Sequence, residues 1–135
     1  MEYSIKQAAE KVSLTEYTIR YYDKEGLLPF VERDKLGNRA FTEDDLEWLG
    51  LICCLKNTGM TIKQIKEFIR LCLDGDETLE IRKELLIEHR REVLRKINEL
   101  KLNLEKISYK ISHYTTCCKL PIKNKHIYNA ASIAK

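Results

Sequence analysis

The chain of 135 residues is 44% hydrophobic and 33% charged, which suits one compact domain, or a smaller one with long, solvated helices attached. It shows no signal-peptide pattern and no apolar run near the roughly 18 residues that a membrane span needs, so we expect a soluble cytoplasmic protein without a membrane partner. Its five cysteines, an odd number without a secretory context, argue against a disulfide framework.

The net charge of +3 is unevenly distributed along the chain. Residues 1–75 hold 11 Lys and Arg against 13 Asp and Glu, whereas residues 76–135 hold 13 against 8. Because the N-terminal part is slightly acidic, any binding to nucleic acid there must depend on locally placed basic groups rather than on bulk charge.

Four short helices are predicted in the N-terminal half from their start signals. The stretches "SIKQ", from Ser4, and "TIKQ", from Thr61, each place a hydroxyl residue three positions before Gln, which is the spacing of a capping box. Thr15 and Thr42 are further N-cap candidates. These signals predict helices near residues 5–12, 16–25, 43–57 and 62–73.

The first two helices are joined by only a few residues, "VSLT", which is typical of a helix-turn-helix whose second helix reads DNA. The segment "FVERDKLGNRAF", from Phe30 to Phe41, has apolar ends, turn-forming residues in the middle and no helical period. It predicts a β-hairpin, or wing, with basic residues at or near its tip.

The second predicted helix has a core face, because Ile19 and Tyr22 lie on one side at about 100° per residue. The remaining residues are candidates for DNA contact, since Arg can bond guanine edges or phosphates and Tyr can bond phosphates. A solvated helix face is the alternative. The DNA-binding candidates are Tyr17, Thr18, Arg20, Tyr21 and Lys24 on the helix and Arg33, Lys35 and Arg39 on the hairpin.

From Leu79 to about Thr115 the chain has no Gly or Pro, which predicts one helix of about 55 Å at about 1.5 Å per residue. Apolar residues recur along it at alternating steps of three and four, the pattern of a coiled-coil seam. We expect a partner chain to cover this seam; a helix folded back on its own domain is the alternative. The seam residues proposed for dimerisation are Leu86, Val93, Ile97, Leu100, Leu104, Ile107, Ile111 and Tyr114.

These features divide the chain into three expected parts. Residues 1–75 form a DNA-binding domain, residues 76–115 form a dimerisation helix, and residues 116–135 form a short basic tail. An enzyme is not expected, because the three histidines are far apart in the sequence and no Gly-rich phosphate loop is present. A coiled-coil adaptor whose head does not bind DNA is an alternative.

The motifs "RYYDKEGLLP", "GNRAF", "FTEDDLEWL" and "LKNTGMTIKQIKEFI", with the long terminal helix, together resemble the MerR family of bacterial transcription regulators over about residues 2–115. The resemblance implies a mainly α fold, with a winged helix-turn-helix head and a long helix that pairs in an antiparallel coiled coil. It implies a homodimer that binds and distorts double-stranded promoter DNA, and so acts on RNA polymerase indirectly. It also implies that Tyr17, Arg20 and Tyr21 contact the duplex and that Arg39 occupies the basic position of the wing. In "GNR", Asn38 stands where many relatives have the Tyr to which a phosphate contact is credited.

The same resemblance bears on what the regulator senses. The metal-sensing branch places a cysteine or serine at the start of the long helix, where this chain has Thr78. Cys117, Cys118 and His126 lie where further ligands would be, but two adjacent thiols do not by themselves close a tetrahedral site. We therefore predict no metal and no cofactor, with a metal-responsive regulator that uses Cys117 and Cys118 as the alternative.

The stretch "EWLGLICCLKNTGM" resembles the aldehyde- and thiol-stress-responsive branch of the family (NmlR/AdhR-like), and Cys54 falls at the reactive cysteine of that branch. Helical geometry adds an independent argument. Cys53 lies near the apolar stripe of the helix, at Leu49, whereas Cys54 lies on the opposite side with Glu47 and Gly50. We therefore predict that Cys54 is the sensor thiol; an inert cysteine at a dimer interface is the alternative.

Overall fold

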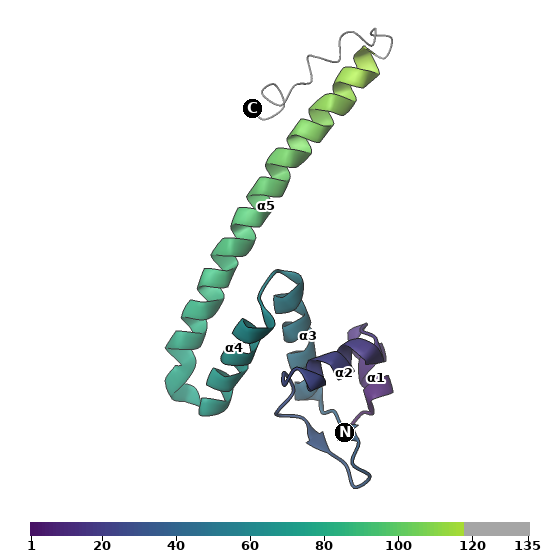
Figure 1. Ribbon diagram of the computed structural model, residues 1–135, viewed down its shortest axis with the longest axis vertical. Coiled ribbons are helices and arrows are strands. Elements are labelled where there is room, and N and C mark those ends of the chain that lie inside the picture. Colours follow the sequence, from purple (N-terminus) through teal and green to yellow (C-terminus); the bar gives the residue numbers. More distant parts are fainter. Residues whose placement is uncertain (118–135) are drawn as a thin grey trace. The chain divides into compact units, whose positions relative to one another are not determined.

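A computed structural model of the chain describes residues 1–117, and residues 118–135 lie outside the description. The contacts divide the chain into two compact units, Met1–Arg90 and the part that begins at Arg91. The elements of Figure 1 are, in order, α1 (Ile5–Val12), α2 (Glu16–Lys24), β1 (Glu32–Arg33), β2 (Arg39–Ala40), α3 (Glu43–Asn57), α4 (Ile62–Asp74), the 3-10 turn η1 (Asp76–Thr78) and α5 (Leu79–Thr116). The mainly α fold and the small hairpin are as predicted.

Side-chain caps begin the helices of the first unit where the sequence signals place them. Capping boxes open α1 at Ser4, α3 at Thr42 and α4 at Thr61, each with both reciprocal hydrogen bonds. Thr15 caps α2 by accepting a hydrogen bond from the backbone N–H of Thr18. Local hydrogen bonding within four residues therefore determines where these helices start.

The turn between α1 and α2 contains Ser13 in the left-handed backbone region, with φ of 57°. Ser13 follows the last residue of α1, so it ends that helix without a glycine. This left-handed residue lets α2 begin three positions later, and the two helices contact each other. The pair forms the helix-turn-helix that the short connection predicts.

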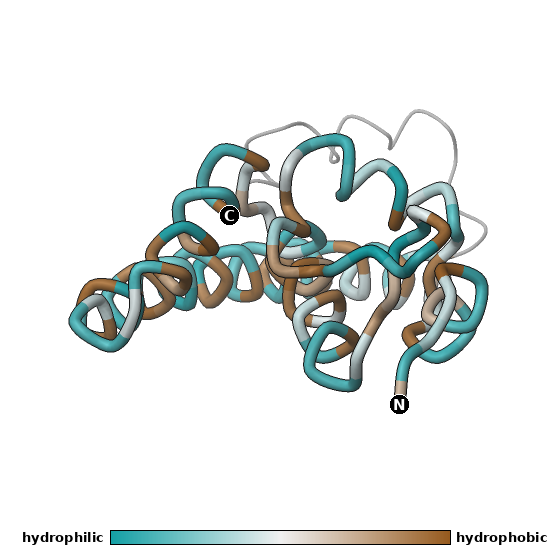
Figure 2. Tube along the Cα trace, turned by 90° about the horizontal axis from the view of Figure 1, so that it is seen from below, coloured by the Kyte–Doolittle hydropathy of each residue, from teal (hydrophilic) through white to brown (hydrophobic). Residues whose placement is uncertain are grey.

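One hydrophobic core joins α1 to α4 in the first unit. Its buried members come from all four helices and from the segments that connect them. Figure 2 shows hydrophobic residues alternating with hydrophilic ones along the helices. Leu46, Leu49, Ile52 and Leu55, three positions apart, put one stripe of α3 into the core. The largest fully buried side chains are Phe41, Ile19, Leu27, Leu28, Leu49, Ile52 and Ile65.

The wing is a two-stranded antiparallel hairpin in which Glu32 pairs with Ala40 and Arg33 pairs with Arg39. Strands of two residues are shorter than the sequence pattern from Phe30 to Phe41 suggests. The N-terminal segment extends the pairing, because Tyr3 and Phe41 exchange backbone hydrogen bonds of 2.7 and 2.8 Å. This long-range bridge attaches the hairpin to the start of the chain.

The long helix α5 runs without a break over 38 residues, about 57 Å at about 1.5 Å per residue. Its first turns belong to the first unit, where Leu86 packs against the hydrophobic core of its own chain. No residue of α5 is buried. Over residues 1–117, no helix is both long and apolar enough to cross a membrane.

Candidate nucleic-acid interface

Helix α2 separates its residues into a core face and a solvent face, as the helical period predicts. Ile19 and Tyr22 are buried, with 1% and 3% of their surface exposed. Burial, with Cys53 of α3 close by, raises the pKa of Tyr22 to about 12, so its hydroxyl stays neutral in the core. The buried face of α2 therefore packs on α3, and its other face is free to meet a ligand.

The predicted DNA contacts on α2 are mostly exposed. Tyr17 is 79% exposed and Tyr21 is 38% exposed, and Arg20 and Lys24 also lie on the surface. Arg20 pairs with Glu16 one turn earlier at 3.2 Å, an exposed ion pair that costs little to exchange for a phosphate or a base. Thr18 is half-buried, and its hydroxyl lies 2.9 Å from that of Thr15.

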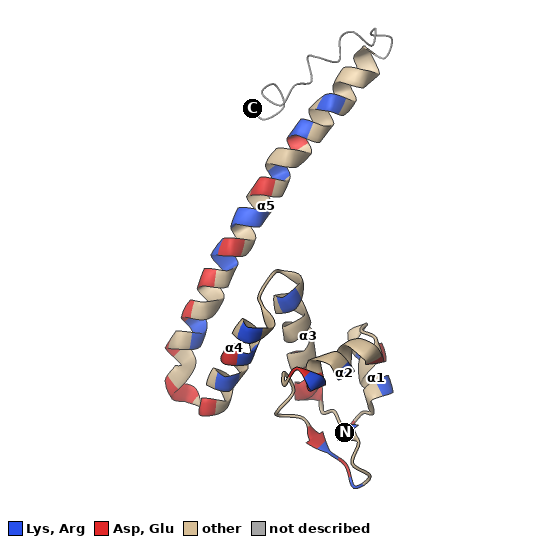
Figure 3. Cartoon of the chain, viewed as in Figure 1, with Lys and Arg blue, Asp and Glu red and all other residues tan. Residues whose placement is uncertain are grey.

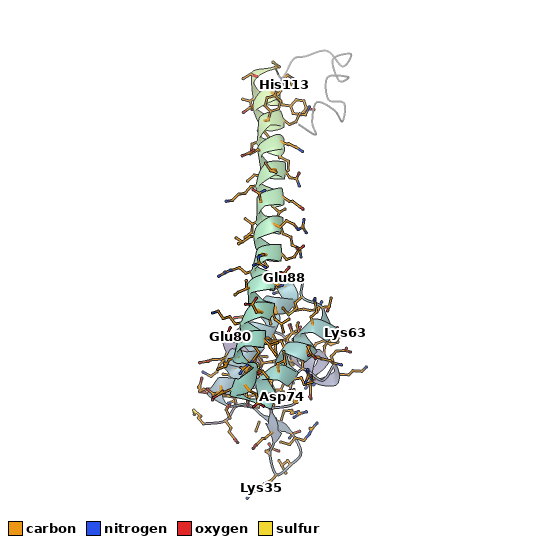
Figure 4. All side chains as sticks on the ribbon, turned by 90° about the vertical axis from the view of Figure 1, so that its left-hand side faces the viewer. Lys35, Lys63, Asp74, Glu80, Glu88 and His113 are labelled. Atoms are coloured by element: carbon orange, nitrogen blue, oxygen red, sulfur yellow. The ribbon has the colours of Figure 1, made fainter. Side chains whose placement is uncertain are left out.

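The tip of the wing is built around Asp34. One carboxylate oxygen of Asp34 accepts hydrogen bonds from the backbone N–H groups of Leu36, at 2.9 Å, and Asn38, at 3.0 Å. Gly37 completes the turn with a positive φ of 84°, a region that favours glycine. The turn leaves Lys35 exposed at the end of the hairpin, where Figure 4 labels it, and Figure 3 shows both signs of charge on the hairpin.

The other two basic residues of the wing bond to protein atoms. Arg33 is exposed, but its guanidinium donates to the carbonyl of Gly37 across the hairpin at 2.7 Å. Arg39 forms an ion pair with Asp23 of α2 at 2.7 Å, and its side chain is only 22% exposed. The wing candidates therefore differ in accessibility: Lys35 is exposed at the tip, whereas Arg39 is engaged in the body of the head.

A groove of about 680 Å³ lies between the N-terminal segment, α2 and the wing. Three basic residues line it, Arg20 from α2 and Arg33 and Arg39 from the hairpin, and so do three acidic residues, Glu2, Asp23 and Asp34. The groove brings together residues that the sequence proposes for DNA contact but that lie up to about 20 positions apart. The surface formed by the exposed face of α2, this groove and Lys35 is the candidate nucleic-acid interface.

The two adjacent cysteines of α3 face different surroundings, as the helical geometry predicts. Cys53 is partly buried beside Tyr22 and accepts a hydrogen bond from the side chain of Asn57, whereas Cys54 is exposed. Glu47 and Gly50, on the same side of α3 as Cys54, are exposed too. Of this pair, Cys54 is the accessible thiol.

The C-terminal turn of α3 is connected to α5 through Thr58. The Thr58 hydroxyl lies 2.7 Å from the carbonyl of Cys54 and 2.7 Å from Nε2 of His89. A carbonyl can only accept, so the hydroxyl proton points to Cys54 and Nε2 of His89 donates to the hydroxyl oxygen. The sequence does not predict this contact, because its partners lie 31 residues apart.

Thr78, at the position where the metal-sensing branch has a ligand, is buried, and its hydroxyl is hydrogen-bonded to protein atoms. Its hydroxyl lies 2.6 Å from the carbonyl of Leu71 and accepts a hydrogen bond from Arg82 at 2.9 Å. Within residues 1–117 no group of three or more His, Cys, Asp or Glu side chains is placed to hold a metal ion. Cys117 is partly buried, and Cys118 and His126 lie outside the described residues.

A helix-turn-helix whose second helix exposes Arg20, Lys24 and two tyrosines, followed by a hairpin wing and a long terminal helix, is typical of a DNA-binding transcription regulator. Residues 3–72 match the family described as "MerR HTH family regulatory protein", and residues 46–108 match "MerR, DNA binding". The chain belongs to the MerR family of helix-turn-helix transcriptional regulators, which are DNA-binding proteins and not enzymes.

Known relatives agree with the branch that the sequence resembles. An HTH-type transcriptional regulator of Haemophilus influenzae is 49% identical over 114 residues, which cover 84% of this chain and 84% of that protein. AdhR of Bacillus subtilis is 37% identical over 91 residues, which cover 67% of this chain and 65% of AdhR. HiNmlR, a MerR family regulator lacking the sensor domain, was solved bound to promoter DNA; it is 48% identical, with a TM-score of 0.80, covering 89% of this chain and 95% of that one.

Proposed function

We propose that this regulator acts in the cytoplasm as a homodimer that distorts promoter DNA and is switched by modification of the Cys54 thiol. In this proposal residues 1–75 bind DNA, residues 76–115 dimerise and residues 116–135 form a basic tail. RNA polymerase is then affected indirectly, through the geometry of the promoter. The observation that supports it is the exposed Cys54 on α3, a helix that contacts α2 through Cys53 and whose C-cap residue, Thr58, bonds to His89 of α5.

Dimerisation through α5 is supported by an uncovered apolar seam. Leu100, Leu104 and Ile111 each have 60% or more of their surface exposed in the single chain. An apolar stripe that continues over several turns is unfavourable in water, and a second helix that packs on it removes it from the solvent. Leu86 differs from the other seam candidates, because it packs against the core of its own chain. The remaining candidates are Val93, which is half-buried, and the exposed Ile97, Ile107 and Tyr114.

The charges on the chain favour an antiparallel pairing of these helices. Residues 74–88 hold six Asp and Glu against two Lys and Arg, whereas residues 95–116 hold five Lys and Arg against two Asp and Glu. An antiparallel pair places the acidic part of one helix beside the basic part of the other, and it also opposes the two helix dipoles. A parallel pair would place like charges together.

DNA binding by the proposed interface rests on exposed residues of α2 and the wing. Arg20 has the geometry to reach base edges or phosphates, and Tyr17, Tyr21 and Lys24 can bond to phosphates. Lys35 at the wing tip adds a second phosphate contact site. Because residues 1–75 are slightly acidic overall, these few groups must supply the attraction.

The proposed switch begins with attack by the Cys54 thiolate on an electrophilic carbon. With an aldehyde, the sulfur forms a bond to the carbonyl carbon, the thiol proton goes to solvent, and the former carbonyl oxygen takes a proton to give a hemithioacetal. The adduct adds volume on the exposed side of α3. Since Cys53 contacts Tyr22 and Thr58 contacts His89, a shift of α3 would reach both the recognition helix and α5.

The experiment that tests the switch is peptide mass mapping of the native protein after limiting exposure to a reactive aldehyde or quinone. We expect Cys54 to be modified before the partly buried Cys53, Cys72 and Cys117. A Cys54→Ser variant should then keep promoter binding but lose the response to the electrophile in transcription. First modification at Cys117 or Cys118, with Cys54 unchanged, would contradict the proposal and require metal analysis of the tail.

A further inference from the structure

Asp23 presents a carboxylate on the recognition helix, in the wall of the groove beside the wing. A negative charge at a surface that meets phosphates weakens binding unless a basic partner neutralises it. The Asp23 side chain is 27% exposed, so water does not fully screen its charge. The presence of an acid at this position therefore needs a structural explanation.

The partner of Asp23 is Arg39, the first residue of the strand that returns from the wing tip. Nη2 of Arg39 lies 2.7 Å from Oδ1 of Asp23, and Nε lies 3.2 Å from Oδ2, which makes the pair bidentate. The remaining guanidinium nitrogen, Nη1, donates to the backbone carbonyl of Val31, just before β1. Each nitrogen of the guanidinium thus has a protein partner, in a fork geometry that only Arg can supply.

We infer that Asp23 and Arg39 are a positioning pair, which fixes the angle of the wing relative to the recognition helix, and that Arg39 is not itself a phosphate ligand. One guanidinium joins three segments: α2 through Asp23, the chain entering β1 through Val31, and β2 through its own backbone. A pair of two-residue strands is marginally stable alone. The bridge between Tyr3 and Phe41 holds the base of the hairpin to the N-terminal segment, and the fork holds it to α2. With the hairpin fixed, Lys35 reaches the DNA backbone from a defined position.

The competing interpretation treats Arg39 as a phosphate ligand whose pairing with Asp23 opens when DNA binds. The two interpretations predict opposite effects for Asp23→Asn. If Arg39 binds phosphate directly, removing the carboxylate frees the guanidinium and removes a repelling charge, so affinity rises or stays the same. If the pair positions the wing, the same substitution breaks the fork, and affinity falls.

The test measures the affinity of Asp23→Asn, Arg39→Gln and the double variant for a duplex selected by the wild-type protein from a randomised library. We expect each single variant to bind about fivefold or more weakly and the double variant to bind no more weakly than Arg39→Gln, because contacting residues are not additive. Wild-type or tighter binding by Asp23→Asn would overturn the inference.

Two further variants distinguish the loss of the fork from a general change in charge. Arg39→Lys keeps the positive charge but cannot form the fork, so we expect it to bind nearly as weakly as Arg39→Gln; near wild-type binding would support a phosphate ligand instead. Glu16→Gln removes another carboxylate from α2, one in an exposed pair with Arg20, and should not weaken binding. Circular dichroism and thermal midpoints identify any variant that loses its fold.

Discussion

Arg20 lies in the middle of α2 and is exposed, as are Tyr17 and Tyr21. Its single ion pair, with Glu16 at 3.2 Å, lies on the surface and contributes about 0.3–0.5 kcal/mol at most. The guanidinium is therefore available to exchange Glu16 for a guanine edge or a phosphate. This accessibility distinguishes Arg20 from Arg39, although both line the same groove.

We predict that Arg20→Ala weakens operator binding by at least about 1 kcal/mol, the loss expected for one bidentate base or phosphate contact. Competition binding against base-substituted duplexes measures both the loss and any relaxed preference. Arg70→Ala is the control, because Arg70 pairs with Glu67 and Asp74 on α4, which does not line the groove. Unchanged affinity for Arg20→Ala would show that α2 does not read the operator.

Two glycines illustrate how the element around a residue determines its role. Gly37 lies at the wing turn with φ of 84°, whereas Gly50 lies within helix α3 and has ordinary helical geometry. At neither position would an added Cβ meet another atom within 4 Å. The effect of an alanine at each position therefore comes from the backbone alone.

We predict opposite changes in stability for these two substitutions. Gly37→Ala should lower the free energy of unfolding by about 1–2 kcal/mol, because the left-handed region is costly for a residue with a Cβ. Gly50→Ala should raise it by about 0.5–1 kcal/mol, the gain in helix propensity. Urea unfolding of both variants measures the difference, and equal shifts would mean that the hairpin turn is not formed as described.

Thr58 connects two elements, because its hydroxyl bonds both the end of α3 and His89 of α5. Its substitution affects the proposed communication between Cys54 and the dimerisation helix more than the DNA surface. We predict that Thr58→Val lowers the free energy of unfolding by about 1 kcal/mol and reduces the effect of an electrophile on DNA affinity. Binding measured before and after limiting modification gives that effect.

A matched control for Thr58→Val is Thr115→Val, because the Thr115 hydroxyl donates to the carbonyl of Ile111 within its own helix. This variant should retain the response to modification. If Thr58→Val responds as fully as the wild type, the signal from Cys54 does not pass through the contact with His89.

At the scale of the whole molecule, the uncovered seam of α5 predicts an oligomer. Leu104 is 60% exposed in the single chain and lies at the centre of the stripe, whereas Leu102 is about 200° away around the helix. A charge placed on the seam would be buried in a coiled coil, and a charge placed opposite would remain in water. The two leucines therefore allow the same substitution at an interface position and at a solvent position.

We predict that Leu104→Glu shifts the protein from dimer to monomer at micromolar concentration and that Leu102→Glu leaves the dimer intact. Sedimentation equilibrium measures the molecular mass directly. The monomeric variant should also bind a palindromic operator more weakly, because only one half-site is occupied at a time. A wild-type monomer, or a Leu104→Glu dimer, would contradict the proposed role of α5.

The positions of the helices could be predicted from the sequence because short-range interactions determine them. Capping boxes, the hydrophobic period and the absence of Gly and Pro from Leu79 onward place the helix boundaries within a residue or two of those observed. The two faces of α2 and the different exposure of Cys53 and Cys54 also follow from a helical period alone. These features depend on residues no more than about four positions apart.

The fold alone decided how these elements meet. The bridge between Tyr3 and Phe41, the fork between Asp23 and Arg39 and the contact between Thr58 and His89 join residues far apart in the sequence. No local spacing encodes such pairs, because they form only after burial of the common core has placed the backbones. The sequence by itself therefore determined which segments are helices and which family they belong to, and the tertiary structure determined which of the basic residues are exposed and which are held by protein partners.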